Sequence, residues 1–342
     1  MTRRWRIGIT RDILDAHGEP AFGRAALAAL EQSHDIDWEY LPSVVPEITP
    51  EHAALYDALY VNVARVPGSA VARADCRLRV VARHGVGYDS VDIPAMSAAG
   101  VLVTHTPNPM PRPVATAALT FILALAGKLM QKDRLTRTGR WHERMEHMGT
   151  GLTGRTLGVI GAGRIGKELL RMARTCDLQL IAADPIADAV ELGYLGTRIV
   201  DLDTLMRTAD FVVVCCLLNA ATRHLIGARE LALMKPSAYF VNVARGPIVD
   251  ETALIDVLAR GTIAGAALDV FEREPVDSTN PLLAMDNVIV TPHSLCWTDE
   301  CFHNMATTGL GSIVAALRGQ PPKFIVNRDV LDHPRVRALL AQ

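Results

Sequence analysis

One glycine-rich segment constrains the fold of this chain more than any other feature. The segment GAGRIG (residues 161–166) directly follows the apolar run TLGVI and directly precedes the helical pattern KELLRMARTC. A second apolar run, QLIAAD, comes next and ends at Asp184. A strand, a glycine turn, a helix and a second strand in this order form a unit with parallel strands and a covering helix. The segment therefore predicts a doubly wound α/β domain.

The same unit predicts a dinucleotide site. Gly161 permits a tight turn, Gly163 lets a pyrophosphate approach the backbone, and Gly166 allows the helix to pack closely on the strand. The N–H groups at the start of the helix attract phosphate. Asp184 can accept hydrogen bonds from the ribose hydroxyls and would repel a 2′-phosphate, so NAD is favoured over NADP. The alternative is a glycine turn that binds nothing. The candidate residues of this motif are Gly161, Gly163, Arg164, Ile165, Gly166 and Asp184.

Short apolar runs alternate with helical patterns along the whole chain, which is typical of parallel sheets covered by helices on both faces. The predicted strands are Arg6–Ile9, Ala58–Val63, Val80–Arg83, Leu157–Ile160, Gln179–Ala183, Phe211–Val214, Tyr239–Val243, Ile263–Leu268 and Val288–Val290. Helices are predicted at Arg164–Thr175, Leu202–Thr208 and Glu251–Arg260, among others.

Two breaks in this alternation predict the domain boundaries. The stretch THTPNPMPRP (residues 104–113) holds four prolines, which favour extended chain, and a long helix is expected from Val114 to about Met130. A second break at Thr291–Trp297 precedes a final helix near Asp299–Arg318. We therefore expect a discontinuous domain of residues 1–104 plus 297–342 and a central domain of residues 105–296.

Composition excludes several classes of protein. The 35 basic and 37 acidic residues leave a net charge of -2, which gives no reason to expect a nucleic acid or an anionic membrane as partner. The N-terminus lacks an apolar signal segment, and the longest apolar stretch, Val114–Gly127, is too short to cross a bilayer. Six cysteines without a CxxC motif fit a reducing compartment, so a cytoplasmic location is expected.

Four other residues suggest a metal at first sight. His293, Cys296, Cys301 and His303 lie close together in the sequence. Their spacing matches no common zinc pattern, so no metal site is expected.

A dinucleotide site together with a cationic, an acid/base and a carboxylate side chain predicts hydride transfer to a keto acid. Such a reaction needs a cation for the substrate carboxylate, a proton donor, and a group that keeps the donor protonated. Arg245 in VNVARGP offers the cation, His293 in VIVTPH the donor, and Glu274 in DVFEREP the supporting carboxylate. Each of the three follows a predicted strand, where ligands of open α/β sheets bind. Taken singly, each has an ordinary alternative as a solvated loop residue.

Together these segments resemble the D-isomer-specific 2-hydroxyacid dehydrogenases, which include phosphoglycerate dehydrogenase and glyoxylate/hydroxypyruvate reductase. The resemblance rests on GAGRIG, VNVARGPIVDE, LDVFEREP and NVIVTPH and runs in order from about Leu78 to Asn327. It implies Arg245 as the binder of the substrate carboxylate and carbonyl, His293 as the acid/base, and Glu274 as its partner.

The resemblance also implies further roles and the complete fold. Asp269 would contact the nicotinamide carboxamide, and the N–H groups of Val86 and Gly87 in HGVGYDSVD would hold the substrate carboxylate. The helix near Val114 would form a homodimer. The family fold has two Rossmann/flavodoxin-like doubly wound domains, a discontinuous substrate-binding one and an NAD-binding one, with the active site in the cleft between them.

Departures from the family pattern leave the substrate open beyond a small 2-hydroxy or 2-keto acid. Asn62 stands where phosphoglycerate dehydrogenases have an arginine, which puts phosphoglycerate in doubt. Trp297 either lines the substrate pocket or packs at the domain crossing. Two alternative functions also remain. One is an NADH-sensing, corepressor-like interaction protein on the same fold, and the other is NAD-dependent oxidation of another small anion such as formate or phosphonate.

Overall fold

The computed structural model describes residues 4–341, so the ends of the predicted discontinuous domain, residues 1–3 and 342, lie outside the described part. The chain divides into two compact units, Met1–Met110 with Trp297–Gln342 and Pro111–Cys296. The sequence analysis predicted the first boundary between the two domains after residue 104. Residues 105–110 instead belong to the first unit, in which the N–H of His105 donates to the carbonyl oxygen of Phe324 and the N–H of Thr106 to that of Gly85.

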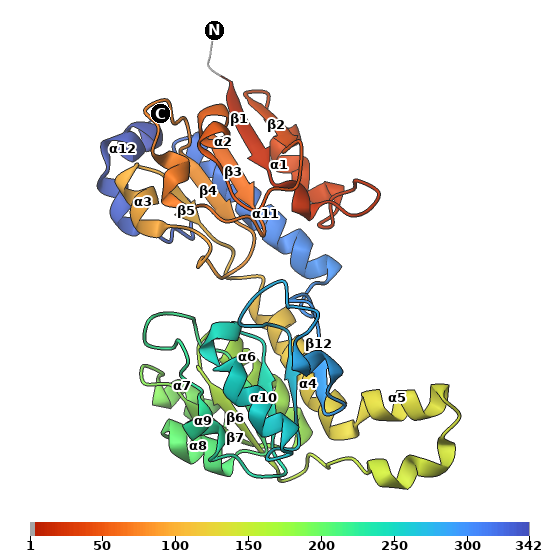
Figure 1. Cartoon of the computed structure of the whole chain (residues 1–342). Coiled ribbons are helices and arrows are strands. Elements are labelled where there is room, and N and C mark those ends of the chain that lie inside the picture. Colours follow the sequence, from red (N-terminus) through yellow and green to blue (C-terminus); the bar gives the residue numbers. More distant parts are fainter. Residues whose placement is uncertain (1–3, 342) are drawn as a thin grey trace. The chain divides into compact units, whose positions relative to one another are not determined.

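The first unit is built on a five-stranded sheet in the order β2-β1-β3-β4-β5, with every pairing parallel (Figure 1). The strands are β1 (Trp5–Ile9), β2 (Ile36–Tyr40), β3 (Ala58–Val61), β4 (Val80–Arg83) and β5 (Leu102–Thr104). The helices are α1 (Ala28–Glu31), α2 (Pro50–Leu55), α3 (Ile93–Ala98), α11 (Asp299–Leu317) and α12 (Pro334–Leu340). This strand order is that of flavodoxin-like folds, and it reverses between β1 and β3.

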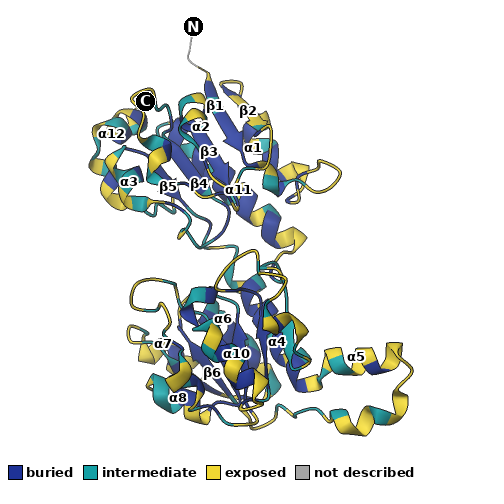
Figure 2. Cartoon of the chain, viewed as in Figure 1, coloured by how far each residue is buried: buried dark blue, intermediate teal, exposed yellow. Residues whose placement is uncertain are grey.

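Apolar cores lie on both faces of this sheet. Alternate strand residues such as Tyr60 pack with α11, while their neighbours such as Leu59 pack with α2 and α3. Strands β1, β3, β4 and β5 are largely buried in Figure 2, as expected of parallel strands with helices on both sides. Helix α11 comes from the C-terminal part of the chain, so this domain is discontinuous in sequence.

The second unit contains a seven-stranded parallel sheet in the order β12-β11-β10-β9-β6-β7-β8. The strands are β6 (Thr156–Ile160), β7 (Gln179–Ala183), β8 (Thr197–Ile199), β9 (Phe211–Val214), β10 (Tyr239–Asn242), β11 (Gly265–Leu268) and β12 (Val288–Val290). The helices are α4 (Pro111–Gly127), α5 (Leu129–Arg137), α6 (Arg164–Ala173), α7 (Ala189–Tyr194), α8 (Leu202–Thr208), α9 (Ala228–Leu231) and α10 (Glu251–Ala259). The two sheets confirm the predicted fold class, two doubly wound parallel-sheet domains.

The order of the second sheet reverses between β6 and β9. In open α/β sheets, ligands bind beside the carboxyl ends of the strands at such a point. Helices α4 and α6 cover one face of the sheet and α8, α9 and α10 cover the other. The fold therefore brings the loops after β6, β9, β10, β11 and β12 to one edge of the domain.

Helix α4 differs from its predicted bounds at both ends. It begins at Pro111 rather than Val114, because prolines are tolerated in the first turn of a helix, where the N–H groups have no partner in the helix. It ends at Gly127, because Lys128 adopts a left-handed conformation with φ of 48°. Helix α5 then starts in a new direction, and Figure 1 shows it projecting from the rest of this unit.

No single helix within residues 4–341 has the length and apolar character needed to cross a membrane. Helices α4 and α5 reach that length and composition only when taken together, and they are bent by 59°.

Candidate active site

The glycine turn after β6 has the shape that a dinucleotide requires. Gly161 has φ of 93°, and a Cβ there would lie 2.6 Å from Cα of Cys216 on the loop after β9. Around Gly163, a Cβ would meet no heavy atom within 4 Å, so its backbone is open to a ligand. At Gly166, a Cβ would lie 2.2 Å from the carbonyl oxygen of Gly161, so helix α6 packs closely on the turn. The three glycines thus fit a bound pyrophosphate.

Asp184, at the end of β7, is fixed beside this turn. Its Oδ2 accepts a hydrogen bond from the N–H of Ala162 at 2.8 Å, and its Oδ1 accepts one from Ile186 at 3.0 Å. Ile186 is 91% exposed, which is unusual for an isoleucine. An acid and an apolar surface therefore stand together where the adenosine of a dinucleotide would lie.

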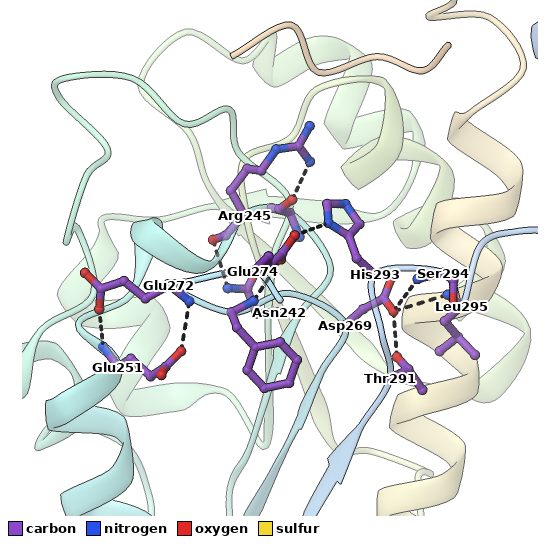
Figure 3. A network of polar contacts seen from close by, with 12 residues as sticks. Asn242, Arg245, Glu251, Asp269, Glu272, Glu274, Thr291, His293, Ser294 and Leu295 are labelled. Atoms are coloured by element: carbon purple, nitrogen blue, oxygen red, sulfur yellow. Dashed lines mark hydrogen bonds and ion pairs between the residues drawn. The ribbon is translucent and has the colours of Figure 1, made fainter. Parts of the chain in front are cut away.

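Arg245 follows β10 and is presented by a turn that Asn242 shapes. The Oδ1 of Asn242, a buried residue, accepts a hydrogen bond from the N–H of Ala244 at 3.0 Å. Its Nδ2 donates to the carbonyl oxygen of Arg245 at 3.0 Å. A guanidinium nitrogen of Arg245 donates in turn to the carbonyl oxygen of Ala244 at 2.7 Å. The turn leaves the Arg245 side chain half-buried near Glu274 and His293 (Figure 3).

Glu274 and His293 form an ion pair. Nδ1 of His293 lies 2.7 Å from Oε2 of Glu274, and the other carboxylate oxygen accepts a hydrogen bond from the N–H of Phe271 at 3.0 Å. Because an ionised carboxylate only accepts, Nδ1 of His293 carries the hydrogen, and Nε2 is the nitrogen left for other partners. The structure thus brings together three of the predicted side chains, each on a loop after one of the neighbouring strands β10, β11 and β12.

The surroundings of Glu274 keep it ionised. Burial alone would raise the pKa of its carboxyl group. The hydrogen bond and charge of His293, the N–H of Phe271 and the charge of Arg245 outweigh burial, so the pKa of Glu274 lies below its usual value of 4.5. A glutamate that stays charged can hold the imidazole in one orientation through Nδ1.

Asp269, which follows β11, organises the loop that carries His293. A single oxygen, Oδ1, accepts hydrogen bonds from the Oγ1 of Thr291 at 2.6 Å and from the N–H groups of Ser294 at 3.0 Å and Leu295 at 3.2 Å. These bonds flank His293, whose φ of 55° is unusual for a residue with a side chain. Asp269 is buried, and its carboxylate fixes both sides of the His293 turn (Figure 3).

Val86 and Gly87 lie in the first unit, on the loop after β4. Gly85 anchors this loop: its N–H donates to Oγ1 of Thr106 at 2.9 Å, and its own φ is 128°. His105 contacts the carbonyl oxygen of Val86 through Nδ1 at 2.9 Å. Within residues 4–341, no partner is recorded for the N–H groups of Val86 and Gly87. The loop therefore presents two backbone donors.

A buried pair of side chains, His84 and Tyr60, lies at the start of this loop. His84 directly precedes it, and its Nδ1 is hydrogen-bonded to the hydroxyl of Tyr60. Burial, and secondarily the charge of Arg83, lowers the pKa of His84 to about 3. His84 is thus a neutral structural residue, packed edge-on against Phe302 of α11.

Other predicted residues are placed as follows. Arg164 is exposed at the start of α6 and Ile165 is partly buried next to it. Trp297 is 48% exposed and packs against Phe302 within the first unit, with ring centroids 4.9 Å apart. In the part of the chain from residue 4 to 341, no three histidine, cysteine, aspartate or glutamate side chains are grouped as a metal site.

The sequence did not predict three residues that shape this site. Asn242 looked like an ordinary strand residue, although a buried asparagine at the end of a strand is a signal that it bonds the following turn. His224 and Glu272 form a second pair, with Nε2 of His224 lying 2.7 Å from Oε1 of Glu272. No sequence spacing links residues 224 and 272, so only the fold reveals this contact.

Comparison with known proteins identifies the family. The family model of the D-isomer specific 2-hydroxyacid dehydrogenase, NAD binding domain, matches residues 119–294. Glyoxylate reductase of Thermofilum pendens is 38% identical over 258 residues, which span 74% of this chain and 76% of that protein. Glyoxylate reductase of Korarchaeum cryptofilum is 33% identical over 330 residues, 95% of this chain and 97% of that protein.

A solved structure shows the same likeness in three dimensions. A glyoxylate reductase from Paecilomyes thermophila has a TM-score of 0.82 at 27% identity, covering 95% of this chain and 99% of that one. Because the matched domain is an NAD-binding domain and the glycine turn fits a dinucleotide, the predicted cofactor NAD is confirmed. The chain belongs to the family of D-isomer-specific 2-hydroxyacid dehydrogenases.

Proposed function

We propose that this dehydrogenase reduces a small 2-keto acid to the D-2-hydroxy acid with NADH, and catalyses the reverse oxidation with NAD. The observation that supports the proposal most directly is the group of Arg245, Glu274 and His293 at one edge of the sheet. That edge also carries the glycine turn, so a cation, a proton donor and the dinucleotide site share one end of the domain. Family relatives named glyoxylate reductase favour a small substrate.

In this proposal each side chain has one task. Arg245 binds the substrate carboxylate and polarises the keto oxygen with its planar guanidinium. Nε2 of His293 donates a proton to that oxygen as negative charge develops there, an effect worth roughly 10²- to 10⁴-fold in rate. Glu274 stays ionised and fixes the imidazole through Nδ1. In the oxidation the same nitrogen takes the proton back.

The cofactor supplies the hydride, and the protein holds it in place. Gly161, Gly163 and Gly166 leave space for the pyrophosphate, with Arg164 and Ile165 at the start of α6 beside it. Asp184 binds the adenosine ribose. Asp269 uses one oxygen for the His293 loop, and we assign the other to the nicotinamide carboxamide.

Val86 and Gly87 are proposed to bind the substrate carboxylate through their N–H groups. Support comes from the anchored loop, which presents both donors without a recorded partner in the described chain. Asn62, which is buried, offers no cation for a phosphate, so an unphosphorylated substrate is preferred.

We also propose a homodimer, as expected from the sequence, but with a shifted contact. Helix α4 is largely buried within its own unit, whereas the extension formed by α5 and the 3-10 helix Trp141–His147 is exposed. Large apolar side chains on or next to this extension are strongly exposed: Leu129 57%, Met130 48%, Trp141 61%, Met145 69% and Met148 65%. Such a set of exposed apolar groups is typical of an interface.

A substrate panel tests the proposed activity. The purified enzyme is assayed with NADH and NADPH against glyoxylate, hydroxypyruvate, pyruvate and 3-phosphohydroxypyruvate, and with NAD against formate and phosphonates. We expect the highest kcat/KM for a small unphosphorylated 2-keto acid with NADH, and a D-configured product on chiral analysis. Turnover of formate or a phosphonate alone, or NADH binding without turnover of any compound, contradicts the proposal.

A further inference from the structure

Two histidines near the candidate active site share an uncommon backbone conformation. Within residues 4–341, four residues other than glycine have positive φ, and two of them are His224 at 51° and His293 at 55°. A left-handed conformation is unfavourable for a residue with a side chain, so contacts must hold it. Both rings are bonded to glutamates of one loop: His293 to Glu274, and His224 to Glu272.

His224 connects this loop to the segment that follows Arg245. Its backbone N–H donates to the carbonyl oxygen of Pro247 at 2.9 Å, while its ring binds Glu272 at 2.7 Å. The neighbouring Ile226 continues the contact, because its N–H donates to Ile248 at 3.1 Å and its carbonyl oxygen accepts from Asp250 at 2.9 Å. The loop after β9 thus runs beside the Arg245 segment for several residues.

Glu272 is held between His224 and the start of α10. The N–H of Glu272 donates to Oε2 of Glu251 at 2.8 Å. The N–H of Glu251 donates a longer bond to Oε2 of Glu272 at 3.4 Å (Figure 3). Each carboxylate therefore lies at the backbone N–H of the other residue, and each has a further side-chain donor. Nδ2 of Asn280 donates to Oε1 of Glu251 at 2.7 Å, and His224 donates to Glu272.

The backbone at Phe271 and Glu272 in turn fixes the proposed catalytic groups. The N–H of Phe271 donates to Glu274, which holds His293. Gly246, next to Arg245, is so close to the peptide between Phe271 and Glu272 that a Cβ would lie 2.4 Å from the nitrogen of Glu272. A shift of Glu272 is therefore transmitted to both the Arg245 and the Glu274 loops.

We propose that His224 is a positioning residue, which orients Glu274 and Arg245 by holding Glu272 in place. This inference rests on the proposed function, since it assigns those two residues to catalysis. The ring of His224 bonds the Glu272 carboxylate, so in this proposal it acts through Glu272 and not on the substrate.

The variant His224→Asn tests this role. Asparagine adopts positive φ readily, so the backbone is kept, but its shorter side chain does not reach Glu272. We expect kcat for the best 2-keto acid to fall about tenfold, because small misplacements of catalytic groups are costly. The KM for NADH should change less than about twofold.

Two further variants and a control sharpen the result. His224→Gln keeps a donor with longer reach and should recover most of the lost kcat. The double variant His224→Asn with Glu272→Ala should be no slower than Glu272→Ala alone, since both changes break one contact. The control is Asp256→Asn, which breaks the exposed ion pair with Arg260 at the end of α10 and should leave kcat and the KM for NADH unchanged.

The outcomes separate this inference from the proposed function. Wild-type turnover of the substrate panel decides the function, whatever the variants do. If the wild type is active and His224→Asn has the same kcat, the inference fails and the function stands. Parallel losses of thermal stability, NADH affinity and kcat also overturn it, since they indicate a structural role only.

Discussion

Gly246 lies directly against the carbonyl group of Phe271. A Cβ at position 246 would be 1.8 Å from the carbonyl oxygen and 1.9 Å from the carbonyl carbon. Both atoms belong to the backbone, so neither can move aside as the end of a flexible side chain can. The loop after β10 and the loop after β11 therefore touch through their main chains, and this contact sets the spacing between Arg245 and Glu274.

The variant Gly246→Ala is expected to be strongly destabilised. The new methyl group must push the two loops apart, and overpacking of this kind costs about 1–3 kcal/mol or more. We expect a clearly lower thermal midpoint and at least a hundredfold loss of kcat, as both loops move. Gly193→Ala in α7 is the control, because nothing lies within 4 Å of a Cβ there and alanine favours helix. A Gly246→Ala protein as stable as the wild type would contradict this view of the contact.

Arg245→Ala should abolish reduction of the 2-keto acid while NADH still binds. The guanidinium is assigned to the substrate, and it contacts the protein through the carbonyl oxygen of Ala244. The guanidinium should interact with the substrate more strongly in the transition state than in the ground state. Losing this interaction is expected to lower kcat/KM by at least about 10³-fold. Stopped-flow turnover and NADH fluorescence titration measure the two effects separately. Arg245→Lys is expected to recover little, since lysine lacks the planar fork. Equal loss of NADH affinity would assign Arg245 to the cofactor instead.

Glu274→Gln should change how stability depends on pH. The pKa of Glu274 is lowered in the folded protein, mainly by His293, so the unfolded chain binds that proton more readily. The carboxylate then contributes stability that is fully present above its ordinary pKa of 4.5 and is lost as the pH falls through the lower folded value. The stability difference between wild type and Glu274→Gln should be constant above pH 4.5 and shrink as the pH falls from there through the folded pKa of Glu274. Urea unfolding at a series of pH values measures this, and a difference independent of pH would refute it.

Much of this architecture follows from sequence pattern because the strands are buried on both faces. Runs such as FVVV at Phe211–Val214 are apolar throughout, and the structure gives that strand the predicted bounds. Three strands lacked such a signal. The edge strand β2 alternates, as IDWEY, between buried and exposed residues, and β5 and β8 have only three residues each. In these places the pairing with a neighbouring strand decides the structure, and a local pattern does not record it.

In the candidate site too, some features could be predicted from the sequence and others could not. Residues at strand ends, such as Arg245 and Asp184, were predictable because the topology of a parallel sheet brings those ends together. Contacts between loops could not be predicted from the sequence. The pairing of His224 with Glu272 joins residues far apart in sequence. It also depends on a left-handed backbone at His224, which no sequence motif predicts.

Asp184 should make the enzyme prefer NADH to NADPH. Both carboxylate oxygens are already oriented by backbone N–H groups, from Ala162 and Ile186, so the charge cannot turn away from a 2′-phosphate. We expect kcat/KM to favour NADH by at least about 100-fold, equal to a difference near 3 kcal/mol. Asp184→Ser should reduce this ratio at least tenfold by removing the repulsion. A wild-type enzyme that uses both cofactors equally well would remove Asp184 from the ribose site.

The exposed extension gives the last prediction, which concerns assembly. Trp141 and Met145 expose 61% and 69% of their surface on a segment that projects from the second unit. Aromatic and methionine side chains dominate the energy of many interfaces, so replacing both by serine should weaken a dimer by several kcal/mol. Light scattering should then show a dimeric wild type and a largely monomeric double variant at micromolar concentration. Val44→Ser is the control, because Val44 is 66% exposed but lies outside the extension. A double variant that remains dimeric would place the contact elsewhere, since an interface built on this extension has to include its largest apolar side chain.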